Sequence, residues 1–355
     1  MKVYVLPADA HGCGHYRLMW PAEICREQGV DVQIMPPKKD SGFLAKTREG
    51  PDGKQIITSI QVPADADVIV IQRPAHPLQV QMIRMMRQNN IAVVVDMDDD
   101  MNSIHPKNGA FLAYHPKSNS PHSWKFAAES CKEATFVTTS TTTLQRIYGH
   151  PNRSAVLDNY IPASMLMESK PITGAFGWAG TIQSHPDDLQ VTGTIIQKLI
   201  DEGASFRTIG PPAGIKDALR LKEEPNSTGV VPLDKWIKTI GETIDVGMVP
   251  LAPSPFNSSK SRLKGIELMA ANIPWVASPR TEYYKLHKQS GCGFLAQTPK
   301  EWYTHLRRLL GDEPLRKEQV EMGREYMKSQ TYEKQAWRWA EAWQRALEIQ
   351  RGVTA

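Results

Sequence analysis

The sequence lacks any apolar run close to the about 18 consecutive residues that a transmembrane helix needs. Its first residues, MKVYVLPA, turn polar too early for a secretory signal peptide. We therefore expect a cytoplasmic protein with no membrane span.

Cysteine is scarce, with four residues in a chain of 355, and no two of them form a CxxC pair or join a histidine cluster. Scattered cysteines of this kind predict reduced thiols rather than disulfides or a zinc site. We expect no metal site and no resident cofactor.

An excess of charge is also missing, because 42 basic and 38 acidic residues leave a net charge of only +4. This value is too small to indicate nucleic-acid binding by itself. The distribution is more informative, because residues 106–125, here called the basic segment, contain no acidic residue. Its basic side chains are Lys107, His115, Lys117, His122 and Lys125. A solvated surface and a binding loop both explain this composition.

The chain of 355 residues is long enough for two hydrophobic cores, because it exceeds the length up to which a single core keeps growing. Short runs rich in valine and isoleucine alternate with helical patterns, which is typical of buried parallel strands. The runs of the first half are residues 2–6, 30–35, 68–72, 91–96 and 136–139. Those of the second half are residues 175–179, 206–209, 230–231, 246–250 and 275–277. The pattern predicts an α/β protein with two Rossmann-like domains, 1–168 and 169–331.

Two segments stand outside this alternation. Residues 37–62 read as an insertion on the first domain, with a hairpin around Pro51, Asp52 and Gly53. Residues 332–350 predict an amphipathic helix that packs back on the first domain. Its expected apolar stripe consists of Trp337, Ala340, Trp343 and Leu347.

The first predicted strand leads into HGCGHYR, residues 11–17. A nicotinamide-binding fingerprint would need glycine where Arg17 stands, and a carboxylate at the end of the second strand, so this cofactor is disfavoured. A glycine-rich turn that opens a helix can still present backbone amides to an anion. A simple tight turn explains the same residues.

Residues 258–278 contain a second pattern. If a helix begins near Ser258, then Lys260, Lys264 and Glu267 lie on one face of it. Two ammonium groups can offset the charge of a diphosphate, and a carboxylate can accept hydrogen bonds from ribose hydroxyls. A solvated helix face is the alternative, but the following AANIPWVAS run into a buried strand makes it less favoured.

Acidic residues gather in DMDDD, residues 96–100, at the carboxyl end of a predicted strand. Ligands of α/β proteins bind at this edge of the sheet. The carboxylates can cap the next helix, orient an acceptor hydroxyl or bind a metal, and we favour the first two.

Taken together, these motifs resemble the retaining GT-B glycosyltransferases, and more closely a bacteriophage-encoded group of them. ELMAANIPWVAS (267–278) is similar to their donor-site stretch and GCGHYR (12–17) to their glycine loop. DMDDDM (96–101) is similar to their acidic strand end, and GWAGTIQSHPDDL (177–189) to the opening of their donor domain.

The resemblance implies a GT-B architecture whose two sheets face a central cleft, with the acceptor side in domain 1–168 and the sugar nucleotide in domain 169–331. It implies transfer of a hexose from a UDP-sugar to a hydroxyl with retention, in the host cytoplasm if the protein is phage-encoded. The implied catalytic residues, which stabilise the departing diphosphate, are Arg17, Lys260 and Lys264. The implied donor-binding residues are Gly12, Gly14, Gly180, Thr181, His185, Val231, Lys260, Arg262, Lys264 and Glu267. The expected acceptor-side residues are Tyr16, Asp98, Asp99, His105, Lys107, Lys117 and Lys125.

This chain departs from the family at two places. Ser259 stands where many members have a glutamate that contacts the donor sugar, and the loop with Thr181, Gln183 and His185 lacks their arginine and lysine. The diphosphate is then left to Lys260, Lys264 and Arg262. For the acceptor, the basic segment favours a hydroxylated base in phage DNA, and a virion protein or a glycan is the alternative. An epimerase and a non-catalytic sugar-nucleotide binder are the rival functions.

Overall fold

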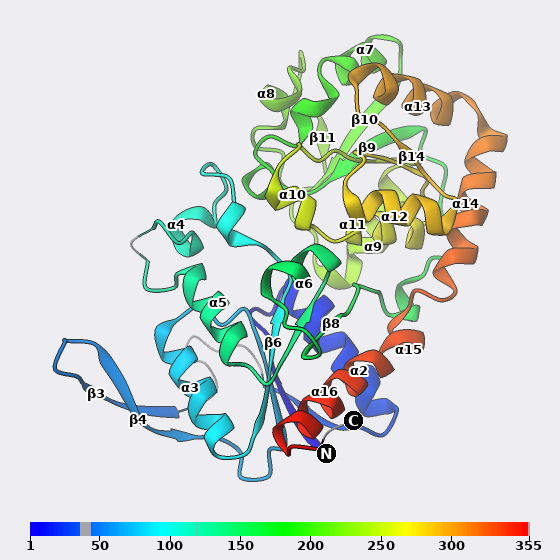
Figure 1. The fold of residues 1–355 in the computed structure, drawn as a ribbon. Helices are drawn as coiled ribbons and strands as arrows, with labels where there is room; N and C mark the ends of the chain where they lie inside the picture. The colour runs from blue at the N-terminus through cyan, green and yellow to red at the C-terminus, as the bar shows by residue number, and fades with distance from the viewer. Residues whose placement is uncertain (36–43, 119, 354–355) are drawn as a thin grey trace.

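The computed structural model describes residues 1–35, 44–118 and 120–353. These residues form two parallel six-stranded sheets with helices on their faces (Figure 1). The prediction of an α/β protein with two Rossmann-like domains is confirmed. The first part of the predicted insertion, up to residue 43, lies outside the described residues.

The first sheet has the order β2-β1-β5-β6-β7-β8. Its strands are β1 (Lys2–Leu6), β2 (Asp31–Ile34), β5 (Val68–Gln72), β6 (Ala92–Met97), β7 (Phe136–Thr139) and β8 (Ser154–Val156). Its helices are α1 (Gly12–Gly14), η1 (His15–Met19), α2 (Trp20–Glu27), α3 (Pro77–Gln88), η2 (Met101–Ser103), α4 (Phe111–Tyr114), α5 (Trp124–Glu133) and α6 (Thr142–Tyr148).

Side chains that alternate along the strands fill a core on each face of this sheet. Val3 and Val5 pack with α2 on one face, whereas Tyr4 and Leu6 pack with α3 and α5 on the other. The register sets Gln72, Asp96 and Thr138 side by side, so the polar ends of three strands meet at one edge.

The second sheet has the order β11-β10-β9-β12-β13-β14. Its strands are β9 (Ala175–Ala179), β10 (Ser205–Ile209), β11 (Asn226–Ser227), β12 (Val246–Val249), β13 (Trp275–Ala277) and β14 (Phe294–Leu295). The α-helices are α7 (Ile195–Asp201), α8 (Ile215–Leu219), α9 (Trp236–Thr243), α10 (Pro255–Ser259), α11 (Leu263–Ala270), α12 (Thr281–Ser290), α13 (Pro299–Gly311) and α14 (Glu313–Met327). Short helical turns are η3 (Ala163–Met165), η4 (Ile182–Ser184), η5 (Leu189–Thr192) and η6 (Leu233–Lys235).

The strand expected at residues 230–231 is wrong. The edge strand β11 lies four residues earlier, and Val230 is 84% exposed in a bend. A two-residue apolar run does not distinguish a short edge strand from a surface turn.

A two-stranded antiparallel hairpin, β3 (Leu44–Glu49) and β4 (Gln55–Gln61), extends from the first domain (Figure 1). Its turn contains Pro51, Asp52 and Gly53, so the predicted hairpin is confirmed, and Gly53 has the positive φ of 73° that such a turn requires. Ile57 is the buried residue of β4 and packs into the core beside α3.

The chain crosses between the domains twice, and the crossings lie together. After α14 it returns to the first domain, where Thr331 forms a parallel bridge with Ile161 of the first crossing. The last helices, α15 (Tyr332–Gln335) and α16 (Trp337–Gln350), pack on the first sheet beside α2 (Figure 1).

The apolar stripe of this C-terminal segment differs from the expected one. Trp337 is 55% exposed, whereas Trp339 is buried, together with Trp343 and Leu347. The buried stripe runs through Ala336, Trp339, Trp343 and Leu347 with Ala340 partly buried beside it, so Trp337 lies one position away from the stripe. None of the described helices is long and apolar enough to cross a membrane.

Candidate functional site

A cavity of about 310 Å³ lies between the two domains, at the carboxyl ends of both sheets. From the first domain it is lined by Gly12, Cys13, Tyr16, Arg17, Arg73, Asp98, Asp99 and Asn159. From the second it is lined by His185, Leu233, Trp236, Leu251, Lys260, Ser261, Leu263, Lys264, Glu267 and Tyr283. Apolar walls with a few converging charged groups are typical of a ligand site.

A more open groove of about 640 Å³ lies between α12 and α14. Its lining includes Glu318, Glu321 and Glu325 and no basic residue. Since this groove would repel an anionic ligand, the interdomain cavity is the better candidate for the predicted site.

The segment with Lys260, Lys264 and Glu267 has a different shape from the one expected. A single helix from Ser258 is wrong, because α10 ends at Ser259, Lys260 has an extended backbone, and α11 begins at Leu263. The break turns the side chain of Lys260 toward the first domain, where its Nζ donates to Asp99 Oδ1 at 2.7 Å. All three predicted side chains still line the cavity.

Glu267 is a buried carboxylate, 6% exposed. Its Oε1 accepts a hydrogen bond from the Tyr16 hydroxyl of the first domain at 2.7 Å. Burial raises the pKa of Glu267, while the nearby positive charge of Lys264 opposes that rise. The carboxylate has a second oxygen that can accept a hydrogen bond from a ligand.

Lys264 lies close to the first strand of the second sheet. Its Nζ donates to the carbonyl of Ala179 at 2.5 Å and lies 5.9 Å from the centre of the Trp178 ring. Burial lowers the pKa of Lys264. A Cβ at Gly180 would lie 2.8 Å from the Trp178 ring and 3.2 Å from Lys264 Nζ, so glycine at this position leaves room for both.

His185 is oriented by Asp188, a residue that the sequence-based list of site residues leaves out. The two are joined by a 2.7 Å hydrogen bond between His185 Nδ1 and Asp188 Oδ2, and Asp188 also accepts from the Ala252 amide at 2.8 Å. Burial lowers the pKa of His185 and outweighs the opposing hydrogen bond to Asp188, while the charges of Lys264 and Lys260 lower the pKa further. At neutral pH the ring is therefore uncharged, with Nδ1–H donating to Asp188 and Nε2 left as an acceptor.

On the first-domain wall, the side chain of Arg17 is buried. Its Nε and NH2 donate to the two carboxylate oxygens of Asp96 at 3.1 and 2.8 Å. Its NH1 donates to the Leu157 carbonyl at 2.5 Å and to Asn159 Oδ1 at 2.8 Å. Four of its five N–H groups therefore have partners within the protein.

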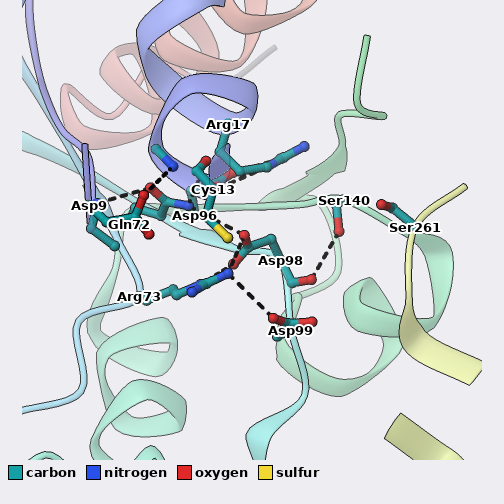
Figure 2. Close-up of polar contacts among 12 residues, drawn as sticks. Asp9, Cys13, Arg17, Gln72, Arg73, Asp96, Asp98, Asp99, Ser140 and Ser261 are labelled. Atoms are coloured by element: carbon teal, nitrogen blue, oxygen red, sulfur yellow. Dashed lines mark hydrogen bonds and ion pairs between the residues drawn. The ribbon is translucent and has the colours of Figure 1, made fainter. Parts of the chain in front are cut away.

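Arg73, which the sequence analysis missed, organises the remaining acids (Figure 2). Its guanidinium donates to both oxygens of Asp98, from NH2 at 2.6 Å and also from Nε. The same NH2 lies 3.4 Å from Asp99 Oδ2. Burial alone would raise the pKa of Asp98, but the charge and hydrogen bonds of Arg73 outweigh it, and the net shift is downward.

The carboxylates at the end of β6 therefore have different partners. Asp96 pairs with Arg17, Asp98 with Arg73, and Asp100 caps η2 by accepting from the Asn102 amide at 3.2 Å. Asp99 pairs with Lys260 of the second domain. In the described part of the chain, no group of three or more His, Cys, Asp or Glu side chains could hold a metal ion.

Other predicted site residues lie outside the cavity lining. Gly14 has a packing role, because a Cβ there would lie 1.9 Å from the carbonyl oxygen of Asp9. Arg262 pairs with Asp158 at 3.5 Å and donates to Gln289 at 2.5 Å. Val231 packs against the core of the second domain, and Thr181 precedes η4.

The basic segment begins at the rim of the cavity, where Asn108 donates to the Ser184 carbonyl next to His185. It is not a single loop, since it contains α4 and the start of α5. Its beginning contacts the second domain through the Gly109 amide, which donates to the Gln183 carbonyl at 3.1 Å. At the same edge His105 Nε2 lies 3.1 Å and Lys107 Nζ 3.8 Å from carboxylate oxygens of Asp187. The two remaining predicted lysines of the segment, Lys117 and Lys125, are exposed.

No protein-family model and no curated protein matches the sequence. Solved structures match the fold. The crystal structure of a glycosyltransferase from Rickettsia africae ESF-5 aligns with a TM-score of 0.62 and 10% identity over 98% of this chain and 99% of that chain. Anabaena Alr3699/HepE, in complex with UDP and glucose, aligns with a TM-score of 0.55 and 13% identity over 99% and 98%.

A mutant of S. aureus TarM, in complex with fondaparinux, alpha-GlcNAc-glycerol and UDP, aligns with a TM-score of 0.56 and 13% identity. The alignment covers 78% of this chain and 55% of TarM, so the chain spans about half of that protein's length. At these identities the matches establish the fold. The chain has the two-domain GT-B architecture that its sequence motifs predict.

Proposed function

We propose that the protein is a glycosyltransferase that moves a hexose from a UDP-sugar to a hydroxyl acceptor with retention of configuration. The observation that carries the proposal is the interdomain cavity, where Lys260, Lys264, His185 and the buried Glu267 lie opposite the glycine turn of the first domain. Two structures of the same fold contain UDP, which supports this donor class. Retention is proposed from the resemblance in sequence motifs.

In this proposal the second domain holds the donor. Glu267 accepts hydrogen bonds from the ribose hydroxyls, and the ammonium groups of Lys260 and Lys264 face the diphosphate. As the bond between the anomeric carbon and the diphosphate oxygen breaks, negative charge grows on the leaving group, and fixed cations stabilise it. The His11 and Gly14 amides already donate to Asp9. The glycine turn would therefore add to this stabilisation through the amides of Gly12 and Cys13.

We assign different roles to His185 and Arg17. The free Nε2 of the neutral His185 accepts a hydrogen bond from a hydroxyl of the donor sugar. Arg17 borders the cavity but is held by Asp96 and Asn159, so we assign it a positioning role for the turn that carries Tyr16. The acceptor oxygen then bonds to the anomeric carbon, and its proton leaves with the departing phosphate.

For the acceptor we propose a hydroxylated base in DNA. The support is the basic segment at the rim, where Lys117 and Lys125 are exposed and no acidic residue occurs between 106 and 125. A polyanion that lies along this rim would gain affinity from these charges.

The test is to incubate the protein with a panel of UDP-sugars and three acceptors: duplex DNA with hydroxymethylated bases, phage structural protein, and a glycan. Mass spectrometry should show one added hexose per modified base, together with release of UDP. Transfer to the structural protein or the glycan would overturn the DNA acceptor and keep the enzyme class. Formation of a new UDP-sugar, or no UDP release with any pair, would overturn the glycosyltransferase itself.

A further inference from the structure

Both main donor-binding side chains are already occupied by groups of the other domain. Glu267 accepts the hydroxyl of Tyr16 at 2.7 Å, and Lys260 donates to the carboxylate of Asp99 at 2.7 Å. Tyr16 lies in η1, and Asp99 follows strand β6, so both partners belong to the first domain.

Tyr16 and Asp99 each offer the same kind of group as the part of the sugar nucleotide that we expect beside Glu267 or Lys260. The Tyr16 hydroxyl donates an O–H to Glu267, as a ribose hydroxyl would. The Asp99 carboxylate offers an anionic oxygen to Lys260, as a diphosphate oxygen would. Glu267 has a second carboxylate oxygen and the Lys260 ammonium has three N–H groups, so competition with the donor is one of position: each partner occupies the place beside the charged group that the ribose or the diphosphate would take.

The two groups of the first domain are held firmly in place. The backbone carbonyl of Tyr16 accepts a hydrogen bond from the Tyr332 hydroxyl. The Tyr16 ring packs edge-on against Trp20, with 4.7 Å between the ring centres. The guanidinium of Arg73 lies within hydrogen-bond distance of Asp99 and helps to hold its carboxylate in place. The same guanidinium also binds Asp98. These supports come from within the first domain and from the C-terminal segment packed on it.

We propose that the first domain occludes the donor site with internal substitutes for the donor, the Tyr16 hydroxyl in place of a ribose hydroxyl and the Asp99 carboxylate in place of a phosphate. This inference rests on the proposed function. The donor then competes with these two interdomain contacts, so each weakens the other by the same factor. Donor binding displaces both contacts at the cavity.

Binding of two probes, uridine and UDP, to two variants tests the two substitutes separately. Tyr16→Phe removes only the hydroxyl and should tighten both uridine and UDP by about tenfold, the value of a hydrogen bond to a charged group. Asp99→Asn should tighten UDP and leave uridine unchanged, because uridine has no phosphate. Titration calorimetry measures all four combinations.

Two control variants separate occlusion from general effects. Thr142→Val removes the 2.8 Å bond from Lys285 Nζ to Thr142 Oγ1, an interdomain contact away from the cavity. Asp187→Asn removes one negative charge from the rim without touching Lys260. Neither should change the affinity for uridine or UDP.

The outcomes are distinguishable. Unchanged or weaker binding of both probes to Tyr16→Phe would overturn the substitute for ribose. Equal tightening by Thr142→Val would overturn it as well, since loosening of the domains would then be the cause, and equal tightening by Asp187→Asn would overturn the substitute for phosphate. If the wild-type protein binds neither probe, the proposed function fails. If it binds both through Glu267 and the variants do not tighten, only the occlusion fails.

Discussion

Arg17 and Asp96 form a two-point ion pair with both side chains withdrawn from solvent, 1% and 0% exposed. The pair joins η1 to the end of β6, and Asn159 and the Leu157 carbonyl extend it to the first interdomain crossing. One guanidinium therefore fixes three segments that border the cavity.

Arg17→Ala should lower the free energy of unfolding by about 3–5 kcal/mol, because it leaves the Asp96 carboxylate buried without its partner. Arg17→Lys should recover little of this loss, since an ammonium group lacks the planar fork. Chemical denaturation of both variants measures the effect. Full stability with lost turnover would instead assign Arg17 to the chemistry, which is the role that its sequence position first suggested.

Glu267→Ala should weaken UDP binding by about 1.5–3 kcal/mol, the value of a charge-assisted hydrogen bond. Titration calorimetry with UDP is the measurement, and Glu318→Ala on the exposed face of α14 is the matched control. UDP affinity equal to that of the wild type would remove Glu267 from the donor site.

The pKa of His185 predicts a dependence of stability on pH. Burial lowers this pKa below the ordinary value of 6.5, so near pH 6 the unfolded chain binds a proton that the folded chain does not. The free energy of unfolding should therefore fall as the pH drops below about 6.5.

The check is to record melting temperatures from pH 5 to 8 for the wild type and for His185→Gln. The wild type should lose stability more steeply toward low pH. The half-buried His76 and His305, whose pKa values are lowered in the same direction, are present in both proteins and cancel in the difference. Parallel curves would show that His185 does not contribute.

If the basic segment guides DNA, acceptor affinity should fall with salt. For about three phosphate contacts, the slope of log affinity against log salt is near −2 to −3, at roughly 0.9 per contact. Replacing Lys107, Lys117 and Lys125 by alanine should flatten the slope and leave UDP binding intact. Because Lys107 lies beside Asp187, its single replacement should matter less than that of Lys117. Salt-insensitive binding of the wild type would contradict the DNA acceptor.

The sequence predicted the fold well because buried parallel strands leave continuous apolar runs. It placed β1, β5, β9 and β12 within a residue or two. It failed where burial does not shape the pattern, as at the edge strand β11. It also missed the break between α10 and α11, because Lys260, Ser261 and Arg262 do not by themselves forbid a helix.

The sequence analysis identified cavity-lining residues that are close together in the sequence. It missed cavity-lining residues that only the tertiary structure brings to the site. Lys260, Lys264 and Glu267 share one segment and line the cavity as expected. Arg73 had one available signal, its place directly after an apolar strand, where α/β proteins bind ligands. Trp236 and Tyr283 had none, since an aromatic residue on a helix more often belongs to a core.

The bridge between Ile161 and Thr331 places both interdomain crossings at one pivot. A relative motion of the domains about this point would displace residues in proportion to their distance from it. Figure 1 shows α4 on the side of the molecule away from α15, near which the crossings lie. Such a motion would therefore open the widest gap along the basic segment. Tyr16, whose backbone carbonyl accepts a hydrogen bond from Tyr332 next to the bridge, would move little.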